Sequence, residues 1–530
     1  MTDSTPDHAP DHAPDHAPDP GYTYPGPPPA SAPLGVGLSD LRERPAAARP
    51  GRGRAGLVVG GVAAALLLGG GAVFAVQQLS GAGAQPADVL PGDAYGYVRL
   101  DIDPSAGQKI AAVRFLGKLP QVRDTLTGDD PRKRLWDVLT QDATDRCLSA
   151  LRYDTDIAPW LGDRAGVAIR AGGTEDKPNV ALAVQVSDEA RAKEVLGKLF
   201  ACDPDGADIE TKDGYAIVMP PGTGASTMAA VAKGTLGANS TFTGDMTALG
   251  EQGVVSAWFD LTTGSKQLQD LGAGALGTSG ASSAGVQGRI AAALRFDPSF
   301  VELAGVVRGA KAVNAAPGDT AQLVDLPDDT AAALHLSGAD RAIDSAWPTL
   351  STQLESLSGV TGGDVIGEIE QQLDVSLPDD LKVLLGRSFT LSLPQQDLGV
   401  SDSVVVGGKI VSSDSARTDA LIDRLDQAMG GIVTHGVEGG TVYLATDPAY
   451  VDTLKKGGSL GDTDTFRTAL GDVSHANGVL FIDLDRIESA YLGDLEGDTK
   501  ALVESLRAVG GSTTVTAPGE ASFSLRVVGN

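Results

Sequence analysis

An uncharged apolar stretch of 20 residues, at positions 57–76, constrains this chain more than any other feature of its sequence. As a helix it would span about 30 Å, which is the thickness of the hydrocarbon core of a bilayer. The basic residues near it all precede it, and the next one after it is Arg99. They are Arg42, Arg44, Arg49, Arg52 and Arg54. The positive-inside rule then predicts a transmembrane helix over residues 55–78, with the N-terminus in the cytoplasm and the rest of the chain outside the cell.

A cleaved signal peptide is the alternative, because Ala82-Gly83-Ala84 has the small residues of a cleavage site. About fifty residues precede the apolar run, however, whereas a whole signal peptide has about 15–30. We therefore favour an uncleaved single-pass anchor. Gly56 and Gly60 have the spacing at which two membrane helices can pack, so the sequence allows a weak homodimer.

Residues 1–54 are rich in proline and lack hydrophobic periodicity, which predicts a disordered cytoplasmic tail. The tail holds three tandem Asp-His-Ala-Pro repeats at residues 7–18. In a polyproline II helix, a four-residue period turns successive imidazoles by about 120°, so they do not converge on one metal ion. A solvated tail is the preferred interpretation.

The net charge of the chain is -28, from 41 Lys and Arg against 69 Asp and Glu. Residues 88–530 carry most of it, with 36 basic and 62 acidic side chains. A nucleic-acid binder needs a basic face, so this class of protein is excluded. Because the chain has 2 Cys and 6 His, we expect no cofactor and no metal centre built on those ligands. The acidic turn from Asp203 to Glu210 lacks the spacing of an EF-hand, so we interpret it as solvated.

The exported region consists of two halves that resemble each other in order. The partner segments are 160–164 with 384–388, 180–186 with 404–410, 241–242 with 465–466, and 258–261 with 481–484. The offset between partners stays at 223 or 224 residues, which chance matches would not maintain. The sequence therefore predicts an internal duplication, with repeat one at 88–311 and repeat two at 325–530, after a linker at 79–87. The region also exceeds the roughly 250–300 residues at which one core stops growing, so we expect two domains.

Alternation of apolar and polar residues predicts the strands of repeat one. They are expected at 95–102, 166–170, 180–186, 207–210, 215–219, 254–259, 290–296 and 301–307. A helix is expected at 188–200 with Ser187 as its N-cap, and a partner helix at 415–429. This order implies a largely antiparallel sheet with helices on one face. The predicted fold class is α+β: two duplicated sheet-plus-helix units behind a disordered tail and one transmembrane helix.

Cys147 and Cys202 both fall in repeat one. Two cysteines in an exported domain most simply pair, so we predict a disulfide rather than two separate buried thiols.

Residues 457–461 match the G-x-S-x-G pattern of a serine hydrolase, with Ser459 in the nucleophile position. That motif needs a strand before the serine and a helix after it, whereas here residues 448–456 look helical and 462–464 look like a polar loop. The region's histidines are His335, His435 and His475, and nothing in the sequence brings them to Ser459. Residues 272–277 match G-x-G-x-x-G without a preceding strand, which argues against a dinucleotide site. We predict no catalytic residue.

The ectodomain opens with Leu90-Pro91-Gly92-Asp93-Ala94-Tyr95 and later contains Trp160-Leu161-Gly162. Together with the anchor and the proline-rich tail, it resembles the actinobacterial membrane proteins catalogued as domain of unknown function 3352. The resemblance covers about residues 86–530. It implies an architecture and a location at the membrane, but the family brings no established activity or site residues.

From these observations we expect a single-pass membrane protein whose acidic extracellular domain binds or scaffolds a component of the cell envelope, without catalysis. The expected partners are the membrane, through one helix, and an envelope component or protein. Two alternatives stay open. One is a carrier of an apolar ligand such as a lipid, which a long apolar cavity would favour, and the other is an extracellular serine hydrolase centred on Ser459.

Overall fold

The structure is a computed structural model that describes residues 84–120, 130–140, 146–172, 179–203, 205–264, 287–310, 318–357, 365–398 and 404–530. In these ranges no helix has the length and apolar character needed to cross a bilayer. The apolar segment at 57–76, the five arginines before it and the glycine-rich match at 272–277 lie outside the described residues. The anchor and its orientation therefore stay predictions.

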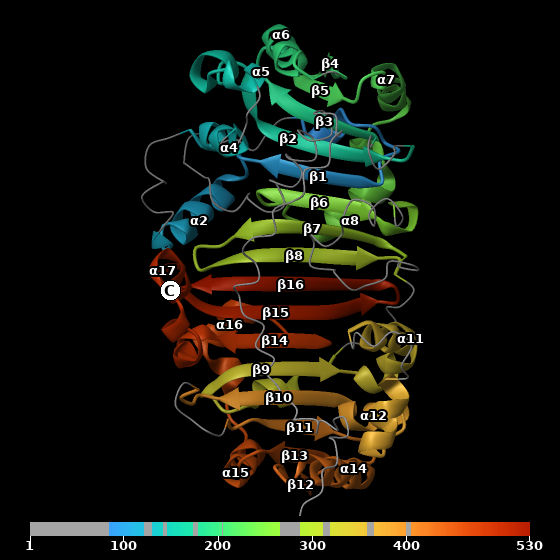
Figure 1. Ribbon diagram of the computed structural model, residues 1–530, viewed down its shortest axis with the longest axis vertical. Coiled ribbons are helices and arrows are strands. Elements are labelled where there is room, and N and C mark those ends of the chain that lie inside the picture. Colours follow the sequence, from blue (N-terminus) through green and yellow to red (C-terminus); the bar gives the residue numbers. More distant parts are fainter. Residues whose placement is uncertain are drawn as a thin grey trace, which may run out of the picture. The chain divides into compact units, whose positions relative to one another are not determined.

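Sixteen strands of the described residues form one antiparallel sheet, seen face-on in Figure 1. The first eight are β1 (Gly96–Asp101), β2 (Leu161–Arg170), β3 (Asn179–Val186), β4 (Asp208–Lys212), β5 (Tyr215–Met219), β6 (Val255–Asp260), β7 (Arg289–Phe296) and β8 (Phe300–Arg308). The second eight are β9 (Thr330–Ser337), β10 (Ser388–Pro394), β11 (Gly407–Val411), β12 (Thr434–Glu438), β13 (Thr441–Ala445), β14 (Gly478–Asp483), β15 (Leu506–Ala517) and β16 (Glu520–Gly529). All the strands predicted for repeat one are present, although β2 begins five residues earlier than expected.

The spatial order of the strands is β12-β13-β11-β10-β9-β14-β15-β16-β8-β7-β6-β1-β2-β3-β5-β4. Strands β9–β16 occur in the same order from one edge of the sheet as β1–β8 from the other edge. The two sets meet at the pair β8 and β16, each the last strand of its set. The two halves thus share one sheet.

Helices lie on both faces of the sheet, so the expectation of helices on one face was wrong. One face, which carries Tyr97, Trp258 and Phe481, packs under helices in both halves. We call it the covered face. Its helices are α7 (Gly224–Lys233), α8 (Ser240–Leu249), α10 (Ala321–Val324), α15 (Pro448–Lys456) and α16 (Asp464–Leu470). Strand β1 is buried along its whole length, because apolar residues on both of its sides have helices over them.

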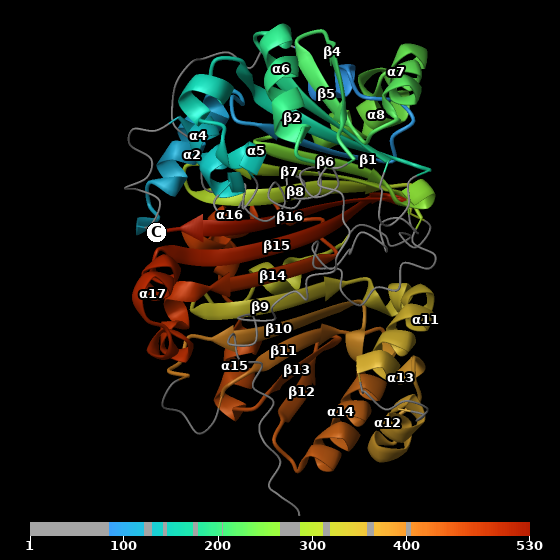
Figure 2. The same cartoon turned by 45° about the horizontal axis from the view of Figure 1, so that its top comes forward.

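Most helices of the opposite face lie towards its two ends, as Figures 1 and 2 show. Near β2–β5 these are α4 (Pro131–Thr140), α5 (Arg146–Ser149) and α6 (Glu189–Phe200), whereas α2 (Ala106–Leu116) packs against one end of β7 and β8. Near β9–β13 they are α11 (Ala339–Leu357), α12 (Val365–Leu373), α13 (Asp379–Leu385) and α14 (Ser415–Met429). A further helix, α17 (Gly497–Glu504), precedes β15. We call this second face the open face.

The start of α6 differs by one residue from the expectation. Asp188, not Ser187, is the N-cap, and its carboxylate accepts a hydrogen bond from the Arg191 amide at 3.0 Å. The Ser187 hydroxyl instead donates to the Pro159 carbonyl at 3.3 Å. Serine and aspartate both favour the N-cap position. The hydrogen bond from Ser187 to Pro159, a tertiary contact, therefore decides which of the two caps α6.

Aromatic side chains fill the covered face beneath α8 and α16. The ring of Phe242, on α8, meets Tyr97 and Trp258 edge to face, with centroids 5.3 and 5.5 Å apart. The Trp258 indole N–H donates to the buried Asp245 carboxylate at 2.9 Å. In the other half, Phe466 on α16 packs against Phe481 at 5.2 Å. The two halves thus bury their covered face with the same kind of helix.

The seam between β8 and β16 pairs nine residues on each strand. On the covered face, Glu302 accepts hydrogen bonds from Arg526 Nε at 3.0 Å and from the Ser524 hydroxyl at 2.8 Å. The Arg526 guanidinium also lies 4.3 Å from the centroid of the Phe300 ring. Glu302 also lies 3.7 Å from Arg295 Nη1, so this largely buried carboxylate compensates the charges of two arginines.

Removing one member of this seam pair should destabilise the protein. In Glu302→Ala we expect the free energy of unfolding to fall by about 2–4 kcal/mol, since Arg526 would keep a largely buried charge without its carboxylate. Chemical denaturation checks this. The matched control is Glu194→Ala, whose partner Lys198 lies on an exposed helix face, and we expect no measurable change there. Equal effects in the two variants would contradict the role of the seam pair.

Candidate functional site

A continuous row of apolar residues crosses the open face from strand to strand. The register aligns one residue from each of seven neighbouring strands, and we call this set the leucine row. Its members, in spatial order from β7 to β10, are Leu294, Leu303, Leu525, Gly511, Leu480, Leu334 and Leu391. Six of the seven are leucine.

The four central leucines of this row are exposed. Leu303 and Leu525 retain 41% and 42% of their accessible surface, and Leu480 and Leu334 retain 40% and 38%. The open side of an antiparallel sheet is ordinarily polar, because the side chains there remain in water. An apolar surface of this kind usually marks a place where a partner or ligand binds.

The rows on either side of the leucine row are also uncharged. One consists of Val301, Val527, Val509, Ile482 and Ala332, and the other of Gly305, Phe523, Thr513, Gly478 and Leu336. None of the three rows contains Tyr, Trp, Met or Arg. Of the residue types enriched at protein interfaces, only one phenylalanine, Phe523, is present, and the rest of the surface is aliphatic or small.

The covered face offers a second candidate, a polar one. Asp101 pairs with both Arg99 and Arg164, the latter through Nε at 3.0 Å, and all three residues are buried. Two adjoining cavities of about 350 and 370 Å³ share Arg99, Gln85 and Gln252 in their walls. Two guanidiniums share one carboxylate, so the cluster keeps an excess positive charge, and among the described residues the buried Arg99 Nε has no hydrogen-bond partner.

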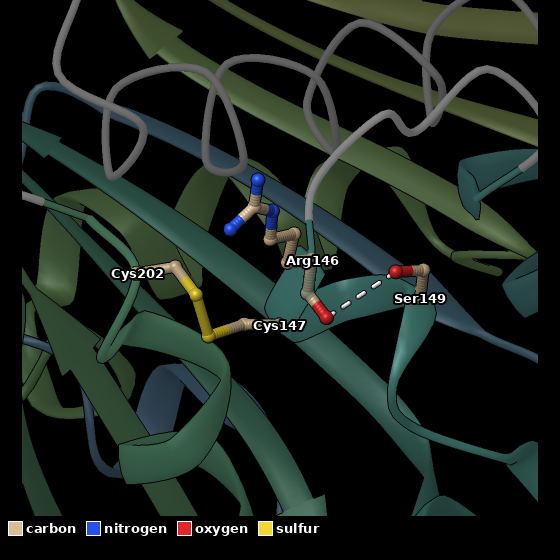
Figure 3. Close-up of a disulfide and its surroundings, with 4 residues drawn as sticks. All are labelled: Arg146, Cys147, Ser149 and Cys202. Carbon is tan, nitrogen blue, oxygen red and sulfur yellow. Dashed lines mark hydrogen bonds between the residues drawn. A yellow bond between two sulfur atoms is a disulfide. The ribbon is translucent and has the colours of Figure 1, made fainter.

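The predicted cysteine pair forms a disulfide, shown in Figure 3. It joins Cys147 on α5 to Cys202 just after α6, with 5.9 Å between the Cα atoms. In the same turn, the Ser149 hydroxyl donates to the Arg146 carbonyl at 3.2 Å. The bond fixes α5 to the helix that covers the open face at that end of the sheet.

Ser459 does not lie in a nucleophile elbow. Helix α15 precedes it, Gly457 adopts a positive φ of 71°, and Ser459 is the exposed N-cap of a short 3-10 turn at Leu460–Asp462. The segment at 462–464, expected to be a loop, contains the end of this turn and the start of α16. No strand leads into the serine, so nothing holds its hydroxyl in the strained exposed position that the motif requires.

The ring nitrogens of two histidines contact other groups. His335 on β9 is buried, its Nε2 donates to the Asp319 carbonyl at 3.0 Å, and its Nδ1 accepts from the Thr390 hydroxyl at 2.8 Å. His435 lies between two carboxylates of α14, with Asp419 at 2.8 Å and Asp423 at 3.0 Å. Both histidines serve local packing.

The acidic turn after α6 uses its carboxylates on the backbone. Asp203 accepts from the Asp205 amide at 3.0 Å, and Asp208 accepts from the Gly224 amide at 2.7 Å. Across the described part of the chain, no group of three or more His, Cys, Asp or Glu side chains is arranged to hold a metal ion.

Comparison with known proteins gives a family match and no function. No curated protein matches the chain. A solved structure described as "Structure of crystal form I of TP0453" aligns with 43% of this chain and 80% of its own, at 9% identity and a TM-score of 0.21, which is too low to support an argument. The family described as "Protein of unknown function (DUF3352)" matches residues 54–241. The first part of the chain is therefore similar to this family of unknown function.

Loss of the disulfide should lower stability. Replacing both Cys147 and Cys202 by serine frees a loop of 55 residues, and we expect the free energy of unfolding to fall by up to about 4 kcal/mol. Denaturant titration of the double variant measures this, with the wild type in excess reductant as the control. The two samples should agree, and an unfolding midpoint equal to that of the oxidised wild type would contradict the prediction.

His335 should make stability depend on pH. Burial lowers the pKa of His335, so the folded state holds the ring neutral, whereas the unfolded chain binds a proton near pH 6.5. The contribution of the neutral His335 ring to the free energy of unfolding is therefore complete above about pH 6.5. Below that pH the free energy of unfolding falls by no more than about 1.4 kcal/mol per pH unit. Unfolding free energies at pH 7.5 and 5.5 should differ less in His335→Gln than in the wild type. The exposed His475 provides the control, since His475→Gln should retain the wild-type slope.

Proposed function

We propose that this chain is a non-catalytic binding module of the cell envelope, and that it holds an aliphatic ligand on its open face. The leucine row carries the proposal. Four leucines, each about 40% exposed, lie on neighbouring strands where water alone would favour polar residues. The proposal therefore combines a binding module with the alternative of a carrier for an apolar ligand such as a lipid. What supports it is an exposed apolar surface, not the long apolar cavity that a carrier was expected to have.

The chemistry of the surface favours a lipid chain over a protein partner. Binding energy at protein interfaces is concentrated in Trp, Tyr and Arg, whereas Leu and Val are under-represented among the residues that dominate it. The leucine row and its two flanking rows contain no Trp, Tyr or Arg, and no charged group that could specify a peptide. A methylene chain needs only apolar contact, which these residues supply.

The location and the architecture enter this proposal as inferences from the sequence. Residues 57–76 would anchor the chain, with the arginines at 42–54 in the cytoplasm and residues 88–530 outside the cell. The matching strand orders of β1–β8 and β9–β16 support an internal duplication and an extension of the family resemblance to the second half. The duplication would then have created the ligand surface, since the row runs through strands of both halves.

Polar substitutions in the row should abolish binding. Leu303 and Leu525 face each other across the seam, so Leu303→Lys with Leu525→Asp introduces opposite charges in a cross-strand pair that the sheet tolerates. We expect at least a tenfold loss of labelling by a photoactivatable single-chain lipid presented in phosphatidylcholine vesicles that hold the full-length protein.

The control is Ile432→Asp. Ile432 is 57% exposed but lies between α14 and β12, outside the row, and its substitution should leave labelling unchanged. Thermal unfolding of each variant verifies the fold. If the double variant folds and is labelled as strongly as the wild type, the open face is not the binding surface.

A further inference from the structure

We infer that the leucine row seats one unbranched acyl chain, which lies across the strands and belongs to a lipid of the membrane that anchors the protein. This rests on the proposed function and adds the orientation, the number of chains and the source of the ligand. Three observations support it: the length of the open part of the row, the position of Gly511 within it, and the place where the chain leaves the described sheet.

The open part of the row has the length of one acyl chain. Neighbouring strands are about 4.8 Å apart, so the four steps from Leu303 on β8 to Leu334 on β9 cover about 19 Å. One leaflet of a bilayer core, half of about 30 Å, is about 15 Å thick. An extended chain from one leaflet therefore fits between the half-buried Leu294 and Leu391 at the two ends of the row.

Apolar contact is continuous across the strands, whereas along β15, the middle strand of the row, it is interrupted. Every member of the row is leucine or glycine, so a chain in this direction meets no polar side chain. Along β15 the open face instead presents Val509, Gly511 and then the exposed Thr513, and the hydroxyl of Thr513 interrupts the aliphatic surface. A ligand centred on Gly511 therefore buries the most methylene area without meeting a polar side chain when it lies across the sheet.

Gly511 forms a low point in the middle of the row. A Cβ placed on it would lie 3.7 Å from Leu525 Cδ1 and 3.8 Å from Leu480 Cβ, which is ordinary van der Waals contact. Space for a side chain is thus present but empty, and an acyl chain can reach the backbone between the two leucines. The backbone of Gly511 has no positive φ, so a larger residue can replace glycine without strain.

The point where the chain leaves the described sheet indicates the source of the lipid. The Ala84 carbonyl accepts a hydrogen bond from the Tyr215 hydroxyl at 2.7 Å, and Tyr215 lies on β5, next to the edge strand β4. Only seven residues lie between Val76 and Ala84, a contour of at most about 28 Å. With residues 57–76 in the bilayer, that end of the sheet stays near the membrane; the row begins at β7, five strands from β5, and leads away from that end through β8 and β16.

The test uses the full-length protein in phosphatidylcholine vesicles that contain a lysophosphatidylcholine probe, with a diazirine either near the head group or near the chain end. After illumination, mass spectrometry maps the adducts. We expect the two diazirine positions to label different strands among β8, β16, β14 and β9. Gly511→Asp should reduce labelling at least tenfold, because its charge lies under the middle of the chain.

Ile432→Asp is the matched control, since it adds the same charge at an exposed residue outside the row and its two flanking rows, and it should change labelling less than threefold. Two results would show that the orientation is wrong while the proposed function stands. In the first, both diazirine positions label the same strand. In the second, Gly511→Asp is labelled like the wild type, but the double variant Leu303→Lys with Leu525→Asp is not. If labelling requires probe added from water rather than from the vesicle, the membrane source is wrong. Absence of adducts on the open face overturns the proposed function as well.

Discussion

The pairing of β8 with β16 is the interaction on which the rest of the structure depends. Each strand is the last of its half, and without the other each would end its half with an open edge of unpaired backbone groups. Pairing satisfies both edges along nine residues and converts two eight-stranded units into one sheet. The edges that remain, β4 and β12, are five residues long and carry polar or charged side chains, which protects them from further pairing.

The seam between β8 and β16 is charged on the covered face and apolar on the open face. On the covered face it buries the Glu302 and Arg526 ion pair, and on the open face it brings Leu303 next to Leu525. The ion pair fixes the register of the two strands, and the register in turn aligns the leucines of both halves into one row. A slip of one residue would move the leucines to the covered face and the charges to the open one. The aliphatic surface is therefore a consequence of strand pairing rather than of any local motif.

An exposed aliphatic surface requires compensation elsewhere in a protein that must stay dispersed. The acidic residues supply it: residues 88–530 carry 26 more acidic than basic side chains, and like charge opposes association between copies. Helices also reduce the exposed apolar area: α6 covers the open face at one end, α13 and α14 cover it at the other, and α2 covers part of β7 and β8. What remains open is the central part, where the strands of the two halves adjoin.

Much of the local structure follows from the sequence. Strand positions from β1 to β8 agree with the alternation of apolar and polar residues, since that period depends only on the pleat of an extended chain. The helices at 189–200 and 415–429 follow from their apolar stripes, although Asp188 rather than Ser187 caps the first of them. The expectation of helices on one face failed because alternation shows which side chains share a face and not what lies over it. In β9, for example, Ala333 and Leu334 are both apolar, yet one is buried and the other exposed.

The candidate site could not be predicted from the sequence, because alternation of apolar and polar residues does not show which face of a strand stays uncovered. Leu303, Leu525, Leu480 and Leu334 are unremarkable leucines in four strands, and they lie as much as 222 residues apart in the chain. By itself, the sequence determined the strands of the first half, the helices at 189–200 and 415–429, the cysteine pair and the acidic character, because these depend on local spacing or on counting. Only the tertiary structure decided which leucines meet and which face stays open, because both depend on long-range strand pairing and on where the helices pack.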